Sequence, residues 1–181
     1  MNSTRVLVAV FLLALGVTAS AATFEDEVLS LEVPAGFQGP IRQSPSPDAV
    51  LVAYTKPHTG ERGTLLQIST YELGSKLPKF TSAELGAAAE KYLLEFLTGV
   101  ERRRSSFQAS KPTRIMLNGV PAAQVTWKGV AQGARLHGTM YCVVIGSRVV
   151  SFHTQDFENA PAENTSEAIR AFESVKFKHA G

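Results

Sequence analysis

The chain has 181 residues, of which 44% are hydrophobic and 19% are charged, with 18 Lys and Arg against 16 Asp and Glu. This composition is typical of a globular protein and predicts one domain. The near balance of charge argues against a nucleic-acid-binding protein, because such proteins need a strongly basic surface to neutralise phosphates. Cys142 is the only cysteine, so no disulfide can form within the chain, and its apolar surroundings predict a buried, inert thiol.

The N-terminal segment has the pattern of a secretory signal peptide. Arg5 is followed by a run of 12 apolar residues (6–17) and by the small-residue cleavage site ASA (19–21). The apolar run is shorter than the roughly 20 residues that a membrane-spanning helix needs, which disfavours an uncleaved anchor. No cysteine follows the cleavage site, so no lipid anchor is expected. We therefore expect residues 1–22 to be a signal peptide and residues 23–181 to be a single periplasmic or secreted domain without stable membrane insertion.

Strands are predicted next along the chain. Residues 28–33 alternate apolar and polar side chains, as in a half-buried strand. Residues 39–48 are rich in proline and predict an exposed loop. Residues 49–55 and 64–73 then predict two strands of a hairpin, joined by a segment rich in Gly and Pro.

A helix is predicted to begin at Thr81. Thr81 and Glu84 have the capping-box pattern, in which each side chain bonds to a backbone N–H of the first turn. Apolar residues then recur at helical spacing and predict one buried stripe: Leu85, Ala89, Tyr92, Leu93, Phe96 and Val100. Arg102, Arg103 and Arg104 end the helix, where positive charge favours the negative end of the helix dipole.

The stretch LNGVPAAQVTW (117–127) predicts a hairpin. Asn118-Gly119 suits a two-residue type I′ turn, because both turn positions need positive φ and these residues tolerate it. Pro121 has no N–H and is expected at an edge or non-bonded position. Hairpin geometry accounts for the whole stretch, so we interpret it as a turn and not as a site.

A second hairpin is predicted from residues 135–145 and 148–155, around a turn at Gly146-Ser147. In the simplest register, both faces of these two strands are apolar, as in central strands that are covered on two sides. A second helix is predicted near the C-terminus, with Asn164 as its N-cap and a buried stripe that includes Ala168, Ile169 and Phe172.

The order of these elements resembles that of the PsbP-like superfamily, to which bacterial DcrB-like periplasmic proteins belong. The resemblance rests on LEVPAGF, LNGVPAAQV, GSRVVSF and EAIRAFESVKF, and it extends from about Phe24 to Lys178. It implies an α+β domain with a single antiparallel sheet flanked by helices on both faces, an α/β/α sandwich. It also implies an accessory or partner-binding protein, because the group has no shared catalytic motif to carry over to this chain.

Metal and cofactor sites find little support in the sequence. The four histidines are scattered, there is no HExxH motif and no second cysteine, so neither a zinc site nor another cofactor is predicted. The acidic run Glu25-Asp26-Glu27 could hold a hard cation, but it lacks the spacing of a calcium loop. A solvated start of the mature chain is the favoured interpretation of this run.

Ser151, His153 and Asp156 lie close together in the sequence and raise the question of a catalytic triad. In one strand, the Cα atoms of residues 151 and 153 are about 6.5 to 7 Å apart, which is loose for a nucleophile and its base. The expected hairpin register places Asp156 opposite His137, so a cross-strand charge pair is predicted in place of a triad. The sequence therefore predicts no enzymatic activity.

The cluster Arg102, Arg103 and Arg104 is the candidate binding site. One interpretation is a solvated helix terminus, and the other is a surface that attracts an acidic protein or anionic lipid headgroups. The leading hypothesis is an exported accessory protein that binds another envelope or secreted protein and has no catalytic centre. The alternative is a small-molecule or lipid carrier with a pocket between the sheet and the Thr81 helix, and an enzyme is the third choice.

Overall fold

The computed structural model describes residues 22–59, 62–76 and 78–178. Residues 1–21 of the expected signal peptide lie outside these ranges. The described elements in chain order are β1 (Ala22–Glu25), β2 (Leu29–Val33), β3 (Gln38–Ser46), β4 (Ala49–Thr59), β5 (Arg62–Glu72), the short 3₁₀ helix η1 (Gly74–Lys76), α1 (Ser82–Glu101), β6 (Ser105–Ala109), β7 (Thr113–Leu117), β8 (Val120–Ala131), β9 (Ala134–Ile145), β10 (Arg148–Phe157), α2 (Ala162–Glu173) and β11 (Lys176–Phe177).

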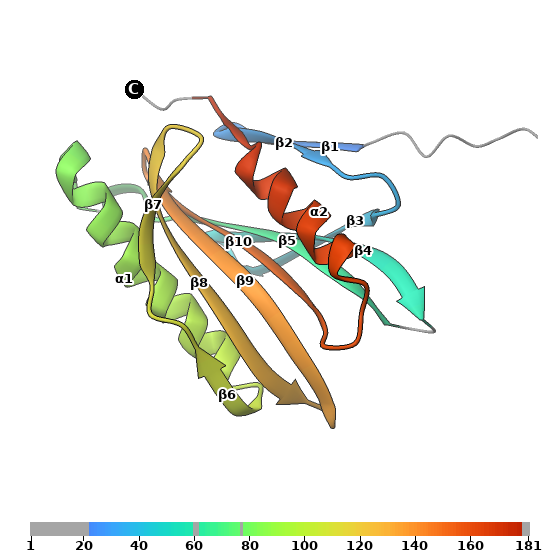
Figure 1. The fold of residues 1–181 in the computed structure, drawn as a ribbon. Coiled ribbons are helices and arrows are strands. Elements are labelled where there is room, and N and C mark those ends of the chain that lie inside the picture. Colours follow the sequence, from blue (N-terminus) through green and yellow to red (C-terminus); the bar gives the residue numbers. More distant parts are fainter. Residues whose placement is uncertain (1–21, 60–61, 77, 179–181) are drawn as a thin grey trace, which may run out of the picture.

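Most of these strands form one large antiparallel sheet (Figure 1). Its strand order is β3-β4-β5-β10-β9-β8-β6, and β7 pairs with the first part of β8. A smaller antiparallel sheet has the order β1-β2-β11. The described part of the chain is thus an α+β fold with a mostly antiparallel sheet and two α-helices, as predicted. The prediction of a single sheet was wrong, because β1, β2 and β11 pair with one another in a second sheet.

The three predicted hairpins are confirmed. Pairing of β4 with β5 joins the two strands of the first hairpin. At the second turn, Asn118 and Gly119 have φ values of +45° and +87°, as a type I′ turn requires. In the third hairpin, Ile145 pairs with Arg148. The alternation of apolar side chains was therefore sufficient to set the register of these strands.

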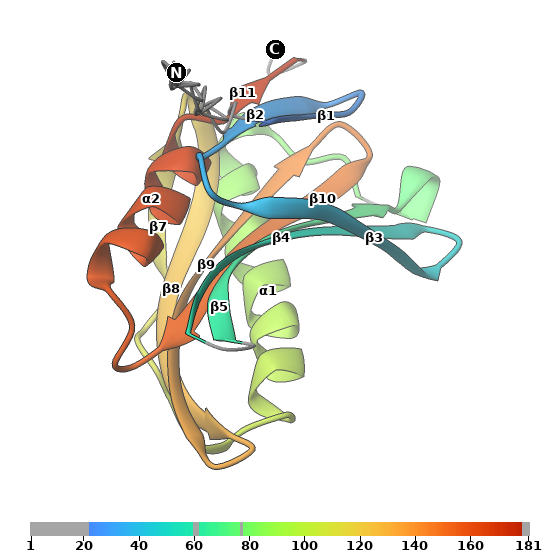
Figure 2. The same ribbon diagram turned by 90° about the vertical axis from the view of Figure 1, so that its right-hand side faces the viewer.

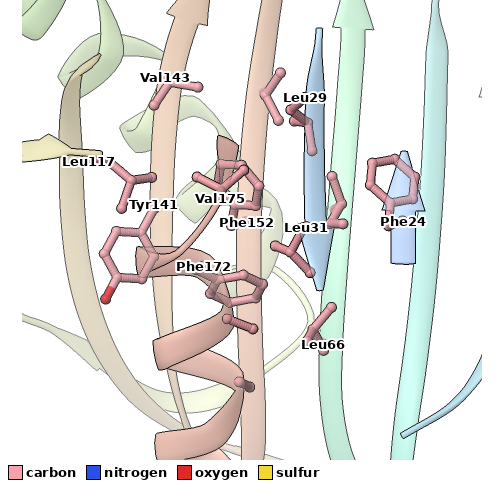
Figure 3. Packing of buried hydrophobic residues seen from close by; sticks show 14 of the residues in the cluster. Phe24, Leu29, Leu31, Leu66, Leu117, Tyr141, Val143, Phe152, Phe172 and Val175 are labelled. Carbon is pink, nitrogen blue, oxygen red and sulfur yellow. The ribbon is translucent and has the colours of Figure 1, made fainter. Parts of the chain in front are cut away.

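Two separate hydrophobic clusters form the core. One contains α2 residues, the small sheet and strand residues such as Tyr141 and Phe152. Figure 3 shows Phe172 of α2 packed near Phe152 and Leu66, with Leu29 and Leu31 of β2 beside them. The other cluster contains α1 residues together with strand residues such as Met140 and Cys142. Neighbouring residues of β8, β9 and β10 thus alternate between the two clusters, as expected for consecutive side chains of a strand.

Helix α1 begins after Thr81, as predicted, and contacts β7, β8, β9 and β10. The Glu84 carboxylate accepts hydrogen bonds from the Thr81 N–H at 2.8 Å and the Thr81 hydroxyl at 2.7 Å, so the helix start is well fixed. Its buried residues are Ala88, Ala89, Leu93 and Leu97, while Tyr92 and Phe96 are half-buried. The buried stripe is therefore close to the predicted one.

Two sequence predictions about local structure were wrong. Residues 39–48 were expected to be a loop, but residues 38–46 form β3, an exposed edge strand with two register shifts against β4. Proline is tolerated there because an edge strand has N–H positions that no neighbour needs. Helix α2 begins after Pro161, so Asn164 lies in the first turn and is buried, instead of being the N-cap. Proline suits a helix start because its N–H is missing where none is required.

Figure 2 shows β2 near the C-terminal end of α2. Helix α2 contacts β10, β5 and β2. The side chain of Asn118 donates a hydrogen bond to the Val175 carbonyl at 2.5 Å, which ties the β7–β8 turn to the segment after α2. None of the helices in the described ranges is long and apolar enough to cross a membrane.

Candidate functional site

The structure separates the three arginines that end α1. Arg102 and Arg103 are exposed, and no ion pair joins either of them to another described residue. Arg104 is half-buried and turns back towards the sheet. Only the first two guanidinium groups are thus available to a partner.

Arg104 belongs to the core beside α1. Its Cζ lies 4.3 Å from the centroid of the Trp127 ring, a cation–π contact. Its Nη1 donates to the Val100 carbonyl at 2.7 Å and its Nη2 to Oε1 of Gln155 at 2.5 Å. Trp127 in turn covers Gly138 of β9, where a Cβ would lie 2.7 Å from the indole. We call Arg104, Trp127, Gly138, His153 and Gln155 the Arg104 cluster.

His153 is the histidine of this cluster, and its ring is buried. Its ring centroid lies 5.6 Å from that of Trp127, and its Nε2 has no hydrogen-bond partner among the described residues. Burial, with a smaller effect from the charge of Arg104, lowers the pKa of His153 to about 3. The imidazole is therefore neutral near pH 7 and packs as an aromatic ring.

A hollow in the surface lies at the opposite end of α1. It is an open groove of about 1080 Å³ between three connections: the segment from β5 to α1, the β7–β8 turn and the β9–β10 turn. Its lining residues are Gly74, Ser75, Pro78, Lys79, Phe80, Ser82, Leu85, Met116, Gly119, Val120, Pro121, Val144, Ile145, Gly146 and Ser147. We call this hollow the turn groove.

The turn groove has an apolar floor and an exposed apolar rim. Val120, Val144 and Ile145 are buried, whereas Met116 is 63% exposed. Lys79 is the only charged residue among the described residues of the lining, and no ion pair joins it to the described chain. The groove thus combines apolar surface with one unpaired positive charge.

Hydrogen bonds within the chain hold the groove walls in place. The Ser147 carbonyl accepts from the backbone N–H groups of Leu73 and Gly74, at 3.0 and 3.3 Å. The guanidinium of Arg148 bonds to Glu72 and Glu27, each at 2.5 Å. The β9–β10 turn is therefore fastened to the segment that leads into α1, and two walls of the groove form one unit.

A second polar cluster surrounds Asp156, whose side chain is fully buried. Its Oδ1 lies 2.9 Å from Nε2 of His58 and accepts from the Phe157 N–H at 2.7 Å, and its Oδ2 accepts from the Thr64 hydroxyl. The predicted charge pair with His137 is wrong, although His137 does lie opposite Asp156 in the register. The side chain leaves β10 on the face where β5 and β4 supply partners.

The three residues considered for a triad do not come together. Side chains alternate along a strand, so His153 and Asp156 point to opposite sides of β10. Ser151 is 5% exposed and His153 is 6% exposed, so neither presents a reactive atom at the surface. Burial also raises the pKa of the Cys142 thiol, which keeps it protonated.

The acidic run at the start of the described chain is divided among three separate contacts. Glu25 pairs with Lys178 at 2.7 Å, and Glu27 with Arg148 at 2.5 Å. Asp26 accepts from the backbone N–H groups of Val28 and Leu29, which shapes its own turn. Within the described ranges, no group of three or more His, Cys, Asp or Glu side chains could hold a metal ion.

The groove was missed in the sequence because its residues come from three separate connections. The sequence interpretation limited Asn118-Gly119 to a turn, but Gly119 and the two residues after it also line the groove. One signal was present: Met116 faces Pro121 across the hairpin, and neither side chain belongs to a core cluster. An apolar pair at a strand end without a buried partner indicates a surface for something else.

Neither a protein-family model nor a curated protein matches this sequence. Solved structures do match it. The solution structure of PsbP (CyanoP) from Synechocystis sp. PCC 6803 has a TM-score of 0.63 at 13% identity, and the match covers 90% of this chain and 95% of that one. LpqN of Mycobacterium tuberculosis, described as involved in cell envelope biogenesis, has a TM-score of 0.55 at 16% identity, over 87% of this chain and 90% of that one.

A third structure is PA94 of Pseudomonas aeruginosa, a protein of unknown function described as a putative regulator. Its TM-score is 0.52 at 14% identity, over 85% of this chain and 94% of that one. Identities this low establish similarity of fold only. The chain thus has a PsbP-like fold, which confirms the resemblance inferred from the order of its elements.

Proposed function

We propose that the protein is an exported accessory protein of the cell envelope that binds another envelope or secreted protein and catalyses no reaction. The observation that carries this proposal is the turn groove, an open apolar hollow with the exposed Met116 on its rim. Exposed apolar surface costs free energy unless a partner covers it, and flexible methionine side chains suit such surfaces. LpqN, which has a similar fold and is described as involved in cell envelope biogenesis, supports a location in the envelope.

The arrangement of the elements supports a binding protein built on a rigid frame. We infer that the two helices cover opposite faces of the large sheet, because α1 and α2 belong to different core clusters. The turn groove is then made by connections at one end of this layered frame. Binding residues are commonly placed in this way, on loops that a rigid scaffold positions.

Arg102 and Arg103 are proposed as a second contact area for the same partner. Both are exposed and free of ion pairs with the described chain. Helix α1 has 20 residues and is therefore about 30 Å long, which is the distance between them and the groove. An interface of ordinary size, about 800 Å² on each partner, can extend over that length. Arg104 is excluded from this area because its guanidinium is engaged inside the protein.

Covalent capture in the native host tests the proposal. The tagged wild-type protein is crosslinked with formaldehyde in intact cells, and the captured proteins are compared with those of an Arg102→Ala/Arg103→Ala variant. The matched control is Arg170→Ala/Lys176→Ala, since these exposed basic residues lie in α2 and β11, which pack in the other core cluster from α1.

We expect one envelope or secreted protein to be captured by the wild type and by the control, and less of it by the Arg102/Arg103 variant. Equal capture by all three would remove the arginines from the binding surface. Capture of nothing specific would contradict the proposed function.

The alternative is a carrier of a small molecule or lipid, and the buried floor of the turn groove favours it as the second candidate. Its volume of about 1080 Å³ is near the upper end of ligand pockets. Native mass spectrometry of protein purified from its host distinguishes the two. A carrier would show a bound mass that is lost when Val120→Trp fills the floor, whereas the partner-binding protein would show none.

A further inference from the structure

We propose that the turn groove receives a segment of a partner protein in which apolar side chains stand beside an acidic residue. This inference rests on the proposed function and names the chemistry of the partner. It follows from the charge, the polar groups and the attachment of the groove walls.

The positive charge at the groove favours a partner segment with a negative charge. Lys79 forms no ion pair with the described chain, and the other described lining residues are uncharged. Glu84 in the first turn of α1 keeps its charge, but its carboxylate is bonded to the N–H and hydroxyl of Thr81 and forms no ion pair with Lys79. An apolar segment with a carboxylate therefore complements the groove, whereas one with a positive group is repelled.

The polar groups of the rim favour a polypeptide over an acyl chain. Ser75 and Ser82 line the groove from the segment before α1 and from the first turn of α1, whereas the Ser147 hydroxyl is bonded to Glu72. Gly74 and Gly146 line it at turns with positive φ, and a Cβ at either position would meet nothing within 4 Å. The Gly74 N–H is bonded to the Ser147 carbonyl, whereas no hydrogen bond joins the Ser75 and Ser82 hydroxyls to the described chain, so these hydroxyls remain for a partner. A polypeptide brings an N–H and a C=O at each residue to meet such groups, whereas an acyl chain brings none.

The apolar part of the groove is ready to bind without rearrangement. Val120, Val144 and Ile145 are held by the sheet, and the walls are fastened by the Ser147 carbonyl and by Arg148. Little ordering entropy is then lost by this side of the interface. Met116 on the rim is the side chain free to adapt to the partner.

Site-specific photo-crosslinking tests the inference in the native host. The photoreactive residue p-benzoylphenylalanine replaces Met116 in the groove. In a matched control it replaces Leu94, which is 45% exposed on α1 outside the groove lining, and in a third protein it replaces Arg103. The captured segment is sequenced by mass spectrometry, and each capture is repeated with Lys79→Glu and with Lys79→Arg.

We expect position 116 to capture one segment that has apolar residues next to an acidic residue. Lys79→Glu should lower that yield about tenfold, as expected for reversal of a charge at an interface, and Lys79→Arg should retain it. Changing that acidic residue to Lys should restore capture by the Lys79→Glu protein, which a merely structural role of Lys79 would not do.

The other outcomes overturn the inference in distinguishable ways. Capture from position 103 or 94 but not from 116 would leave the proposed function standing and remove the groove from it. A lipid captured at 116, a segment without an acidic residue, or a yield unaffected by Lys79→Glu would each refute the partner chemistry proposed here. No capture from any of the three positions would contradict both the inference and the proposed function.

Discussion

At its C-terminal end, α1 is followed by Arg104, whose guanidinium lies over Trp127 and bonds to Val100 and Gln155. At its N-terminal end, α1 is preceded by Lys79, which has no ion pair with the described chain and borders an apolar groove. At the C-terminal end, the charged group of Arg104 is thus packed inside the protein. At the N-terminal end, the charge of Lys79 and the apolar surface of the groove stay accessible to a partner. The difference teaches that charged residues adjacent in sequence do not by themselves form an interaction surface, because some of their side chains can bond inside the folded protein.

The largest effect is expected at Gly138, on which the Arg104 cluster rests. A side chain there would collide with the Thr154 carbonyl and the Trp127 indole, so Gly138→Val should lower the free energy of unfolding by about 3 kcal/mol. Urea denaturation measures it. Gly99→Ala in α1 is the control, since a Cβ there meets nothing within 4 Å, and it should raise stability by about 0.5 to 1 kcal/mol. A Gly138→Val protein as stable as the wild type would mean that the indole does not lie over β9.

Arg104→Ala should lower the free energy of unfolding by about 2 kcal/mol, because it removes a cation–π contact and two charge-assisted hydrogen bonds. Arg103→Ala removes an exposed neighbour of the same type and should change stability by less than about 0.5 kcal/mol. Thermal and urea unfolding of the two variants give the comparison directly. Equal effects would contradict the division of the arginines into one internal and two free groups.

Lowering the pH should lower the free energy of unfolding, because His153 is buried in its neutral form. Its folded pKa of about 3 lies below the ordinary value of 6.5, so the unfolded chain binds the proton more tightly. The stability associated with neutral His153 is therefore fully present above pH 6.5 and declines as the pH falls towards 3, by about 1.4 kcal/mol per pH unit well below 6.5. Between pH 6.5 and pH 5 the loss should be about 1.5 kcal/mol. His153→Phe should remove this part of the pH dependence, and an unchanged slope would mean that the imidazole is not buried.

These effects also show what the sequence could and could not predict. Registers were predictable because the apolar residues from Met140 to Ile145 in β9 and from Val149 to Phe152 in β10 had to face a core cluster, and a shift by one residue would have reversed both faces. The position of the Arg104 side chain was not predictable, because its partners Trp127 and Gln155 are distant in sequence. The helix dipole also explains the three arginines at residues 102–104 equally well. The edge strand β3 was also missed, since its prolines resemble those of a loop until the neighbouring strand is known.

Substitutions near the turn groove, at the N-terminal end of α1, should lower the free energy of unfolding less than those in the Arg104 cluster. Gly119 has φ of +87°, but a Cβ there would meet nothing within 4 Å. Gly119→Val therefore costs only the strain of a β-branched residue in the left-handed region, about 1 to 2 kcal/mol, without a collision. Urea denaturation again measures the change, and Gly119→Asn should recover most of the loss because Asn tolerates positive φ. A wild-type stability for Gly119→Val would show that the turn is not of type I′.

The smallest effect on stability is expected at Met116, and it separates folding from binding most clearly. Met116→Ser removes a side chain that is 63% exposed and belongs to neither core cluster, so the free energy of unfolding should change by less than about 0.5 kcal/mol. Capture of the partner should nevertheless fall, because the serine cannot cover the apolar segment that the groove receives. Arg104→Ala should show the reverse, with a large loss of stability and unchanged capture under conditions where it is folded. If Met116→Ser destabilised the protein as much as Arg104→Ala, the groove would be part of the core, and the two ends of α1 would not differ as described.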